Sequence, residues 1–350
     1  MISEVAVKDE RSTTRCKVCS NAQSNKTHAS REMMLGIRTT FHYSECAACG
    51  SVRLIDPPDD FNMYYPRDYY SFEEPQPENG LKNAMVARVR LLRDRTYLGE
   101  GGWMGRILTQ WYDNPVLRAT LRLKLNASTR ILDVGCGSGK LLLRLHELGF
   151  KSLTGIDPFI SKDVRYGANV WIRKGLLEDI KNENWDVIMF HHSLEHVPDP
   201  LTTLQAAKGL LSVGGQCLVR LPVVSWAWKH YGPSWVGLDP PRHFWLPTDK
   251  GMRILAESVG LEITRVEYDS DGLQFWGSEL YSRDHAYAEV CSGESKLRQH
   301  FTRKQLAEFR QNAKVLNRKG IGDSAAFFMQ RTDMVRGVEQ RPQSAEVVGS

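Results

Sequence analysis

A glycine-rich loop in the middle of the chain is the feature that most constrains how this sequence can fold. Residues 131–140 read Ile-Leu-Asp-Val-Gly-Cys-Gly-Ser-Gly-Lys, so an apolar run typical of a buried strand passes into three glycines and then into a leucine-rich helical stretch. In open α/β sheets such a loop lies at the carboxyl end of the first strand, where the backbone can approach a bulky ligand and the next helix offers free N–H groups. The sequence therefore predicts an α/β fold with a ligand site at this loop.

The spacing of the glycines separates three kinds of ligand loop. A dinucleotide-binding loop needs Gly-x-Gly-x-x-Gly, but Lys140 stands where the third glycine would be, and a phosphate-binding P-loop needs Ser or Thr where this chain has Leu141. The Gly-x-Gly-x-Gly pattern preceded by an aspartate resembles motif I of class I methyltransferases. This resemblance implies S-adenosylmethionine as the cofactor. The residues that it places in the cofactor loop are Asp133, Gly135, Cys136, Gly137 and Gly139.

The sequence around the loop continues the same fold. Short apolar runs alternate with helical stretches from residue 130 to residue 221, which is typical of a mostly parallel sheet covered by helices. The resemblance implies a Rossmann-like class I methyltransferase fold with seven strands. Asp157 ends the second run roughly 20 residues after the loop, where a carboxylate can accept hydrogen bonds from ribose hydroxyls. Glu178 follows the third run, where this fold contacts adenine, although a charge in the first turn of a helix explains it as well.

The fourth run, residues 185–200, carries a second resemblance. Its apolar residues lead into His-His-Ser-Leu-Glu-His-Val-Pro-Asp-Pro, which looks like a signature of methyltransferases from sugar, polyketide and quinone pathways. The resemblance implies that His191 or His192 borders the cofactor, while Glu195 and His196 hold the loop together. The segment also matches His-x-x-Glu-His of inverted zinc peptidases. That chemistry needs both histidines on one continuing helix, which the prolines that follow exclude.

Four cysteines near the N-terminus form two Cys-x-x-Cys pairs. Two such pairs can place four thiolates around one tetrahedral Zn²⁺. Because four sulfur ligands leave no open position for a substrate, the predicted metal is structural, in a zinc-ribbon-like module, with redox or disulfide pairing as the alternative. The predicted ligands are Cys16, Cys19, Cys46 and Cys49.

The cysteine module, the aromatic run at residues 64–70 and the glycine loop together resemble bacterial methyltransferases of glycan and polysaccharide assembly and, in part, sugar C-methyltransferases. Those C-methyltransferases have an acidic residue before their active-site histidine, where this chain has Arg242. We predict His243 as the base that takes the acceptor's proton, with a packed structural histidine as the equal alternative. Arg242 is predicted to pair with a diphosphate or to form a structural ion pair. Tyr231 is a weaker catalytic candidate, and the neighbouring tryptophans suit the wall of a sugar site.

Changes in composition divide the chain into segments. Prolines and acidic residues are dense just after the cysteine module, and helical spacing follows. The predicted segments are a zinc module at 1–55, a proline-rich and aromatic linker at 56–80, a helical lead-in at 81–125, a methyltransferase domain at 126–332 with insertions at 222–247 and 271–322, and a disordered tail at 333–350.

The composition limits where the protein works and what it binds. No apolar run approaches the roughly 20 residues of a transmembrane helix, and Glu4, Asp9 and Glu10 interrupt any secretory signal, so a cytoplasmic protein is expected. A net charge of +5 is too small to predict nucleic-acid binding, although arginines cluster between residues 88 and 122 and allow an anionic acceptor or peripheral membrane contact. The predicted reaction is methyl transfer to a nucleotide sugar or glycan. A small-molecule O-methyltransferase and a catalytically silent cofactor-binding protein remain the alternatives.

Overall fold

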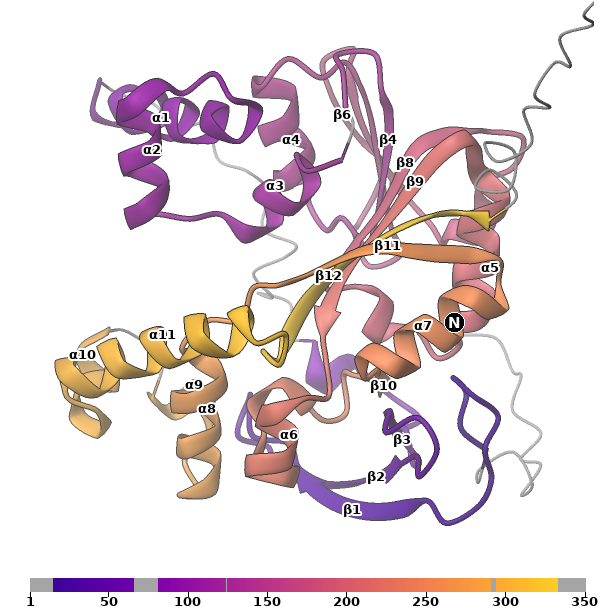
Figure 1. The fold of residues 1–350 in the computed structure, drawn as a ribbon, viewed down its shortest axis with the longest axis vertical. Helices are drawn as coiled ribbons and strands as arrows, with labels where there is room; N and C mark the ends of the chain where they lie inside the picture. The colour runs from indigo at the N-terminus through magenta and orange to yellow at the C-terminus, as the bar shows by residue number, and fades with distance from the viewer. Residues whose placement is uncertain (1–14, 66–80, 124, 291–293, 333–350) are drawn as a thin grey trace, which may run out of the picture.

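The computed structural model describes residues 15–65, 81–123, 125–290 and 294–332. Most of the predicted linker and the predicted disordered tail lie outside these ranges. Figure 1 shows a large twisted sheet with helices around it and a smaller sheet below it.

Eight strands form the large sheet. Their order across it is β11 (Leu261–Tyr268), β12 (Ser324–Arg331), β9 (Leu211–Pro222), β8 (Trp185–His191), β4 (Arg130–Val134), β5 (Ser152–Asp157), β7 (Val170–Lys174) and β6 (Val164–Tyr166). Strands β4, β5, β7, β8 and β9 are parallel, whereas β12 runs antiparallel to both of its neighbours. The predicted mostly parallel sheet is therefore confirmed. The eighth strand, β6, is an addition at the edge, and its three residues are too few to show a period in the sequence.

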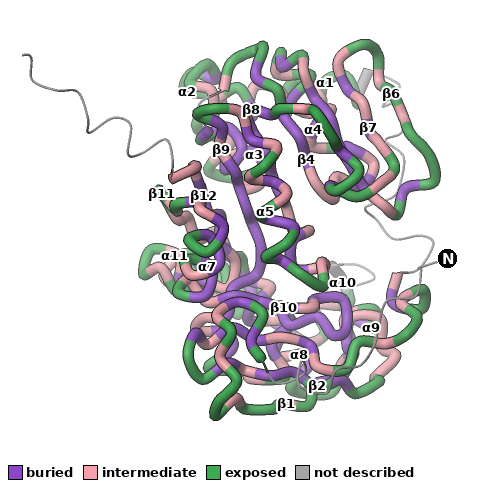
Figure 2. Tube along the Cα trace, turned by 90° about the vertical axis from the view of Figure 1, so that its right-hand side faces the viewer, coloured by how far each residue is buried: buried purple, intermediate pink, exposed green. Residues whose placement is uncertain are grey.

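Alternating side chains of the strands feed two separate cores. Ile131 packs in one core with α3 (Pro115–Thr120) and α4 (Lys140–Glu147), while Leu132 packs in the other with α5 (Pro200–Leu210) and α7 (Asp249–Ser258). Neighbouring residues of a strand point to opposite faces, so one apolar run can fill both cores. Figure 2 shows the central strands buried along nearly their whole length.

The smaller sheet joins the cysteine-bearing N-terminal segment to a strand from the first insertion. Its order is β1 (Lys26–Arg31), β2 (Thr40–Glu45), β3 (Val52–Leu54) and β10 (Trp245–Leu246), so its fourth strand comes from the insertion at 222–247. The cysteine-bearing segment belongs to the same core as α7, because Cys16, Val18 and Cys49 are buried together with Met252 and Leu255. The cysteine module is thus packed directly onto the large domain.

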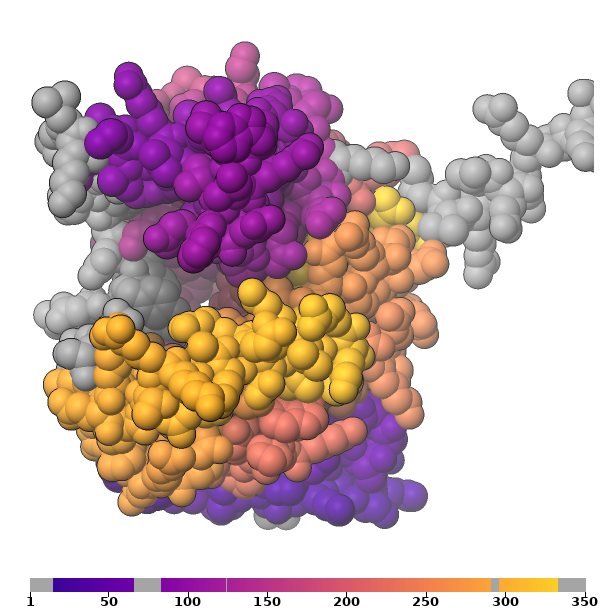
Figure 3. All heavy atoms as spheres, turned by 60° about the vertical axis from the view of Figure 1, so that its left-hand side comes forward, coloured from indigo at the N-terminus to yellow at the C-terminus, as the bar shows by residue number. Residues whose placement is uncertain are grey.

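The remaining helices flank the sheet on one side. The lead-in forms α1 (Leu81–Arg95) and α2 (Gly102–Trp111) before α3, and the second insertion forms α8 (Leu273–Ser282), α9 (Tyr287–Val290), α10 (Glu294–His300) and α11 (Arg303–Arg318). Figure 3 shows the lead-in helices and α11 on opposite sides of a hollow in the surface. Among the described residues, no helix has the length and apolar character that crossing a bilayer requires.

Candidate functional site

The glycine loop after β4 has a backbone that only glycine can follow. Gly135 has φ +74°, and a Cβ there would lie 2.4 Å from the Cβ of Ser193. Gly139 has φ +80°, and a Cβ there would lie 2.5 Å from the side chain of Ile172. Both positions combine a left-handed conformation with close packing, so other residues would displace the loop. The loop is therefore pressed between β7 and the segment after β8.

Asp157, at the end of β5, braces this loop. Its Oδ2 accepts a hydrogen bond from the Gly137 N–H at 2.9 Å, and its Oδ1 accepts one from the Phe159 N–H at 2.8 Å. Burial raises the pKa of Asp157, but these backbone donors oppose that change. Each carboxylate oxygen has a second lone pair, so ribose hydroxyls can still bind here.

Three other predicted cofactor residues surround the loop. Asp133 is buried, and burial together with the charge of Asp157 raises the pKa of Asp133 to about 8, so this side chain is largely protonated at neutral pH. Cys136 is partly buried beside Gly155, where a Cβ would lie 2.4 Å from its sulfur. Glu178 is exposed on the short helix η3 (Leu177–Asp179) that follows β7.

His191, the last residue of β8, has one ring nitrogen engaged and one available. Its Nε2 lies 3.1 Å from the Thr120 hydroxyl. Its Nδ1 is buried and has no hydrogen-bond partner among the described residues. Burial, with the charge of Arg220, lowers the pKa of His191 to about 3, so the ring is neutral. A buried ring nitrogen without a partner fits a residue that borders a bound ligand.

His192 is instead part of a structural chain. Its Nδ1 lies 3.2 Å from Oε1 of Glu195, and its Nε2 contacts the guanidinium of Arg220. Arg220 in turn donates to both carboxylate oxygens of Asp269, at 2.5 and 3.1 Å. This chain links the ends of β8, β9 and β11 and fixes the conformation of the loop after β8.

His243 lies in a buried cluster with His196. The two rings meet edge to face with centroids 4.9 Å apart. His243 Nδ1 lies 2.9 Å from the carbonyl oxygen of Gly237, and His196 Nδ1 lies 2.9 Å from that of Arg242. Because a carbonyl oxygen only accepts, each Nδ1 carries the proton and each Nε2 presents a lone pair. Burial lowers the pKa of His243 to about 4, although the carboxylate of Asp239 opposes this change. His243 is therefore a neutral proton acceptor at pH 7.

Glu195 completes the cluster. Burial alone would raise its pKa, but the hydrogen bond with His192 and the neighbouring histidines lower the pKa of Glu195 to about 2. Its Oε2 is buried with no hydrogen-bond partner among the described residues. The donor atoms of Glu195, His196 and His243 all lie within 4.8 Å of one another. A set of this kind can stabilise a protonated imidazole or hold a divalent cation.

Tyr65 belongs to the site although the sequence pattern placed it in a linker. Its hydroxyl lies 3.2 Å from Nδ1 of His196, and its ring stacks on Phe159 with centroids 5.5 Å apart. Tyr65 thus spans from the residues beside Asp157 to the histidine cluster. The signal in the sequence is the Tyr-Tyr-Pro run, which is too aromatic for an unstructured tether.

The structure pairs the Arg242 side chain with a carboxylate beside the histidine cluster and places Tyr231 in a separate group of aromatic residues. Arg242 is buried and donates to Asp239 at 2.7 Å, so the structural ion pair is the arrangement observed. Among the described residues, Tyr231 makes its side-chain contacts with Glu279, Trp226 and His230.

The prediction that the tryptophans line the wall of a sugar site is wrong for three of them. These side chains fill cores instead, because their large apolar area favours burial. They are Trp228, Trp235 and Trp245.

The four cysteines meet in the geometry of a metal site. The sulfur of Cys16 lies 3.6 Å from that of Cys49, and the sulfur of Cys19 lies 3.5 Å from that of Cys46. Disulfide sulfurs are about 2.05 Å apart. Four ligands at about 2.3 Å from a tetrahedral Zn²⁺ lie about 3.8 Å from one another. The observed distances therefore fit four thiolates around one zinc ion and do not fit disulfides.

The cysteine module holds the loop segment that carries His243, just before β10. The Tyr43 hydroxyl donates to the carbonyl oxygen of His243 at 3.0 Å, and the Leu54 N–H donates to that of Phe244 at 2.8 Å. On the other side, the Phe244 N–H donates to the carbonyl oxygen of Glu195 at 2.9 Å. The segment with His243 is thus clamped between the module and the loop after β8.

Comparison with known families identifies the large domain. Residues 108–266 match the model of a family described as a methyltransferase domain. A ubiquinone biosynthesis O-methyltransferase of Xanthomonas euvesicatoria is 36% identical over 114 residues, which are 29% of this chain and 47% of that protein. A tRNA U34 carboxymethyltransferase of Nautilia profundicola is 29% identical over 137 residues, which are 35% of this chain and 44% of that protein. This chain thus matches about half the length of these curated relatives.

Solved structures resemble the chain more distantly. The cyclopropane synthase MmaA2 from Mycobacterium tuberculosis has 15% identity and a TM-score of 0.39, covering 73% of this chain and 86% of that one. The family match and the strand order agree with the class I methyltransferase fold predicted from the sequence.

Proposed function

We propose that this chain, which belongs to the class I S-adenosylmethionine-dependent methyltransferases, transfers the cofactor's methyl group to an oxygen or carbon atom of a sugar-containing acceptor, with His243 as the base. One observation carries the proposal. The short segment from Ser193 to His196 touches the cofactor loop at one end and His243 at the other. This linkage supports a base close to the place where the methyl group would be delivered.

In this proposal, different residues bind the cofactor, accept the proton and stabilise the protonated base. The glycine loop and Asp157 would hold the cofactor, and bound S-adenosylmethionine supplies an electrophilic methyl group on its sulfonium. His243 Nε2 would take the proton from the acceptor atom to which the methyl group is transferred, and the product cofactor would leave as the neutral thioether. The resulting imidazolium would lie 3.8 Å from the carboxylate of Asp239. Asp239 stays ionised, because Arg242 and His243 outweigh the effect of burial and lower its pKa.

Different observations favour two classes of acceptor. The combination of a cysteine module, an aromatic run and a methyltransferase core, which resembles glycan-assembly methyltransferases, supports a nucleotide sugar or glycan. The similarity to ubiquinone biosynthesis O-methyltransferases supports a phenolic acceptor as the second candidate. We take the sugar as the leading proposal because the match to the ubiquinone biosynthesis O-methyltransferase covers only 29% of this chain.

The cysteine module is proposed to bind a structural zinc ion. The sulfur distances support four-thiolate coordination. The hydrogen bonds from Tyr43 and Leu54 connect the module to the backbone of His243 and Phe244. The module would keep the loop segment with His243 in place without contacting the acceptor. Zinc content measured on the purified protein by atomic emission tests this part, with one ion per chain expected.

The test of the reaction is transfer of labelled methyl from S-adenosylmethionine to a panel of nucleotide sugars and phenols, read by mass spectrometry. We expect a methylated nucleotide sugar with the wild type and its loss with His243→Ala, while affinity for S-adenosylhomocysteine stays unchanged. A methylated phenol would instead select the second acceptor class. Cofactor binding without transfer to any acceptor, equal in both proteins, would indicate a catalytically silent binding protein.

A further inference from the structure

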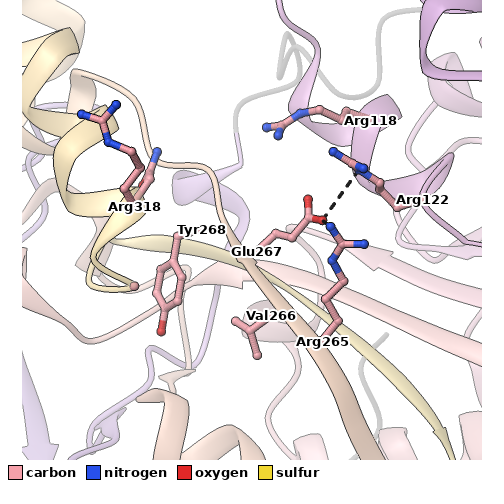
Figure 4. Close-up of a pocket in the computed structure, with 9 residues that line it drawn as sticks. Arg118, Arg122, Arg265, Val266, Glu267, Tyr268 and Arg318 are labelled. Carbon is pink, nitrogen blue, oxygen red and sulfur yellow. Dashed lines mark ion pairs between the residues drawn. The ribbon is translucent and has the colours of Figure 1, made fainter. Parts of the chain in front are cut away.

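A basic pocket lies between the lead-in and the C-terminal helices. It is a shallow depression, largely open to solvent, with a volume of about 470 Å³. Figure 4 shows its three walls, with Arg118 and Arg122 from the α3 side, Arg318 from α11, and Arg265 with Glu267 from β11. Segments almost 200 residues apart in the sequence therefore bring four guanidinium groups to one pocket.

The pocket has more positive charge than its own carboxylates neutralise. Arg118 pairs with Asp113 at 3.2 Å, and Glu267 is shared between Arg122, at 3.7 Å, and Arg265. Four arginines against two carboxylates leave a surplus of two positive charges. Because like charges repel, such a surplus is costly unless water, salt or an anion offsets it.

Two of these arginines have donors to spare. Arg318 has no carboxylate partner among the described residues. Arg118 has a buried Nε without a hydrogen-bond partner in the part of the chain that the structure describes. Guanidinium groups bind phosphate oxygens through two parallel N–H bonds, so these unused donors fit a phosphate better than a single carboxylate.

The pocket is connected to the reaction site through shared elements. Arg122 comes two residues after Thr120, whose hydroxyl contacts His191. On the opposite wall, Tyr268 is followed by Asp269, which holds Arg220 and through it His192. Both walls of the pocket are therefore continuous with residues that contact His191 or hold His192, although β12 and β9 separate its β11 wall from β8.

We propose that this arginine pocket binds the phosphate or diphosphate group of the methyl acceptor. This inference rests on the proposed methyl transfer and narrows its acceptor to a phosphate ester. The phosphate could belong to a nucleotide-linked or to a lipid-linked sugar, because both present the same oxygens to the guanidinium groups. A neutral phenol offers nothing that these groups would bind.

The test measures anion binding apart from catalysis. Calorimetry on the full chain would use three soluble probes, namely inorganic pyrophosphate, uridine diphosphate and geranyl diphosphate. The variant is Arg122→Gln with Arg318→Gln. A matched control, Arg31→Gln with Arg253→Gln, removes the same charge from arginines that are paired with Asp284 and Asp249 on other surfaces.

We expect the wild type and the control to bind a diphosphate and the pocket variant to bind it roughly 10-fold or more weakly. Tighter binding of uridine diphosphate would support a nucleotide-linked acceptor, and tighter binding of geranyl diphosphate a lipid-linked one. Equal affinity in the pocket variant and the wild type, or no binding of any probe, would overturn the inference. Because His243→Ala should leave this binding unchanged, failure of the pocket and failure of the proposed reaction are separate results.

Discussion

Asp157 is the residue whose loss should affect cofactor binding most directly. Its carboxylate already accepts one hydrogen bond from the glycine loop and one from Phe159, and it keeps lone pairs for the ribose hydroxyls that we propose it binds. Hydrogen bonds to a charged group contribute about 1.5 to 3 kcal/mol. Since about 1.4 kcal/mol is tenfold in affinity, Asp157→Ala should raise the Kd for S-adenosylhomocysteine by roughly 10- to 150-fold.

The assay is calorimetric titration with S-adenosylhomocysteine, with thermal unfolding of the ligand-free protein to check that each variant folds. Asp157→Asn keeps the size of the side chain but leaves only one acceptor oxygen, so its affinity should also fall. Asp186→Asn is the matched control, because Asp186 accepts a backbone hydrogen bond from Arg130 at 2.8 Å at the opposite end of β4. If folded Asp157→Ala bound the cofactor product as tightly as the wild type, the ribose hydroxyls would have to bind elsewhere.

Three further predictions follow from other parts of the molecule. Removing zinc with a chelator, or replacing Cys46 by Ser, should lower both methyl transfer and thermal stability; full activity in metal-free protein would contradict a structural metal. Burial raises the pKa of Asp323 from 3.8 to about 6, so the folded state binds a proton at this carboxyl more tightly than the unfolded state does. The contribution of this group to the free energy of unfolding is therefore fully present below pH 4 and is lost as the pH rises through 6. At about 1.36 kcal/mol for each pKa unit, denaturant unfolding should show a loss of about 3 kcal/mol between pH 4 and pH 7 that Asp323→Asn lacks; an equal pH dependence in both proteins would refute this. Tyr65→Phe removes the contact with His196 and should lower kcat about fivefold, with cofactor affinity unchanged; an effect on cofactor Kd alone would assign Tyr65 to binding.

The parts of the molecule that the sequence predicted are those encoded by neighbouring residues. The glycine loop and Asp157 lie within 25 residues of one another, and each is marked by the spacing of residue types that its position requires. The four cysteines form two local Cys-x-x-Cys pairs, and the preference of zinc for four thiolate ligands predicts that the two pairs meet. The alternation of apolar runs gave the parallel sheet because each strand is buried on both faces.

The parts that the sequence did not predict depend on contacts between distant segments. Tyr43 meets the carbonyl oxygen of His243 across 200 residues, and no local pattern marks either residue for the other. β3 likewise finds its partner in β10, two residues long and inside an insertion. The tryptophans were misassigned for a different reason. A sugar site and an apolar core both favour aromatic rings, and only the packing around Trp235 and Trp245 distinguishes the two.

These long-range contacts explain why a methyl-transfer site of this kind would need a metal module that never touches its substrates. In the proposed reaction the base must remain neutral and must keep its Nε2 lone pair toward the acceptor, which requires the Nδ1–H group to keep donating its hydrogen bond to the carbonyl oxygen of Gly237. That orientation depends on the backbone of residues 237–246, whose regular structure is limited to the end of the short helix η6 (Val236–Leu238) and the two-residue strand β10. Hydrogen bonds from Tyr43 and Leu54 on one side and to Glu195 on the other replace the rigidity that a longer strand would give. A zinc ion that fixes Cys46 and Cys49 would stiffen β2 and β3, the strands that carry those donors. A zinc ion in the module would therefore act on catalysis through the position of His243.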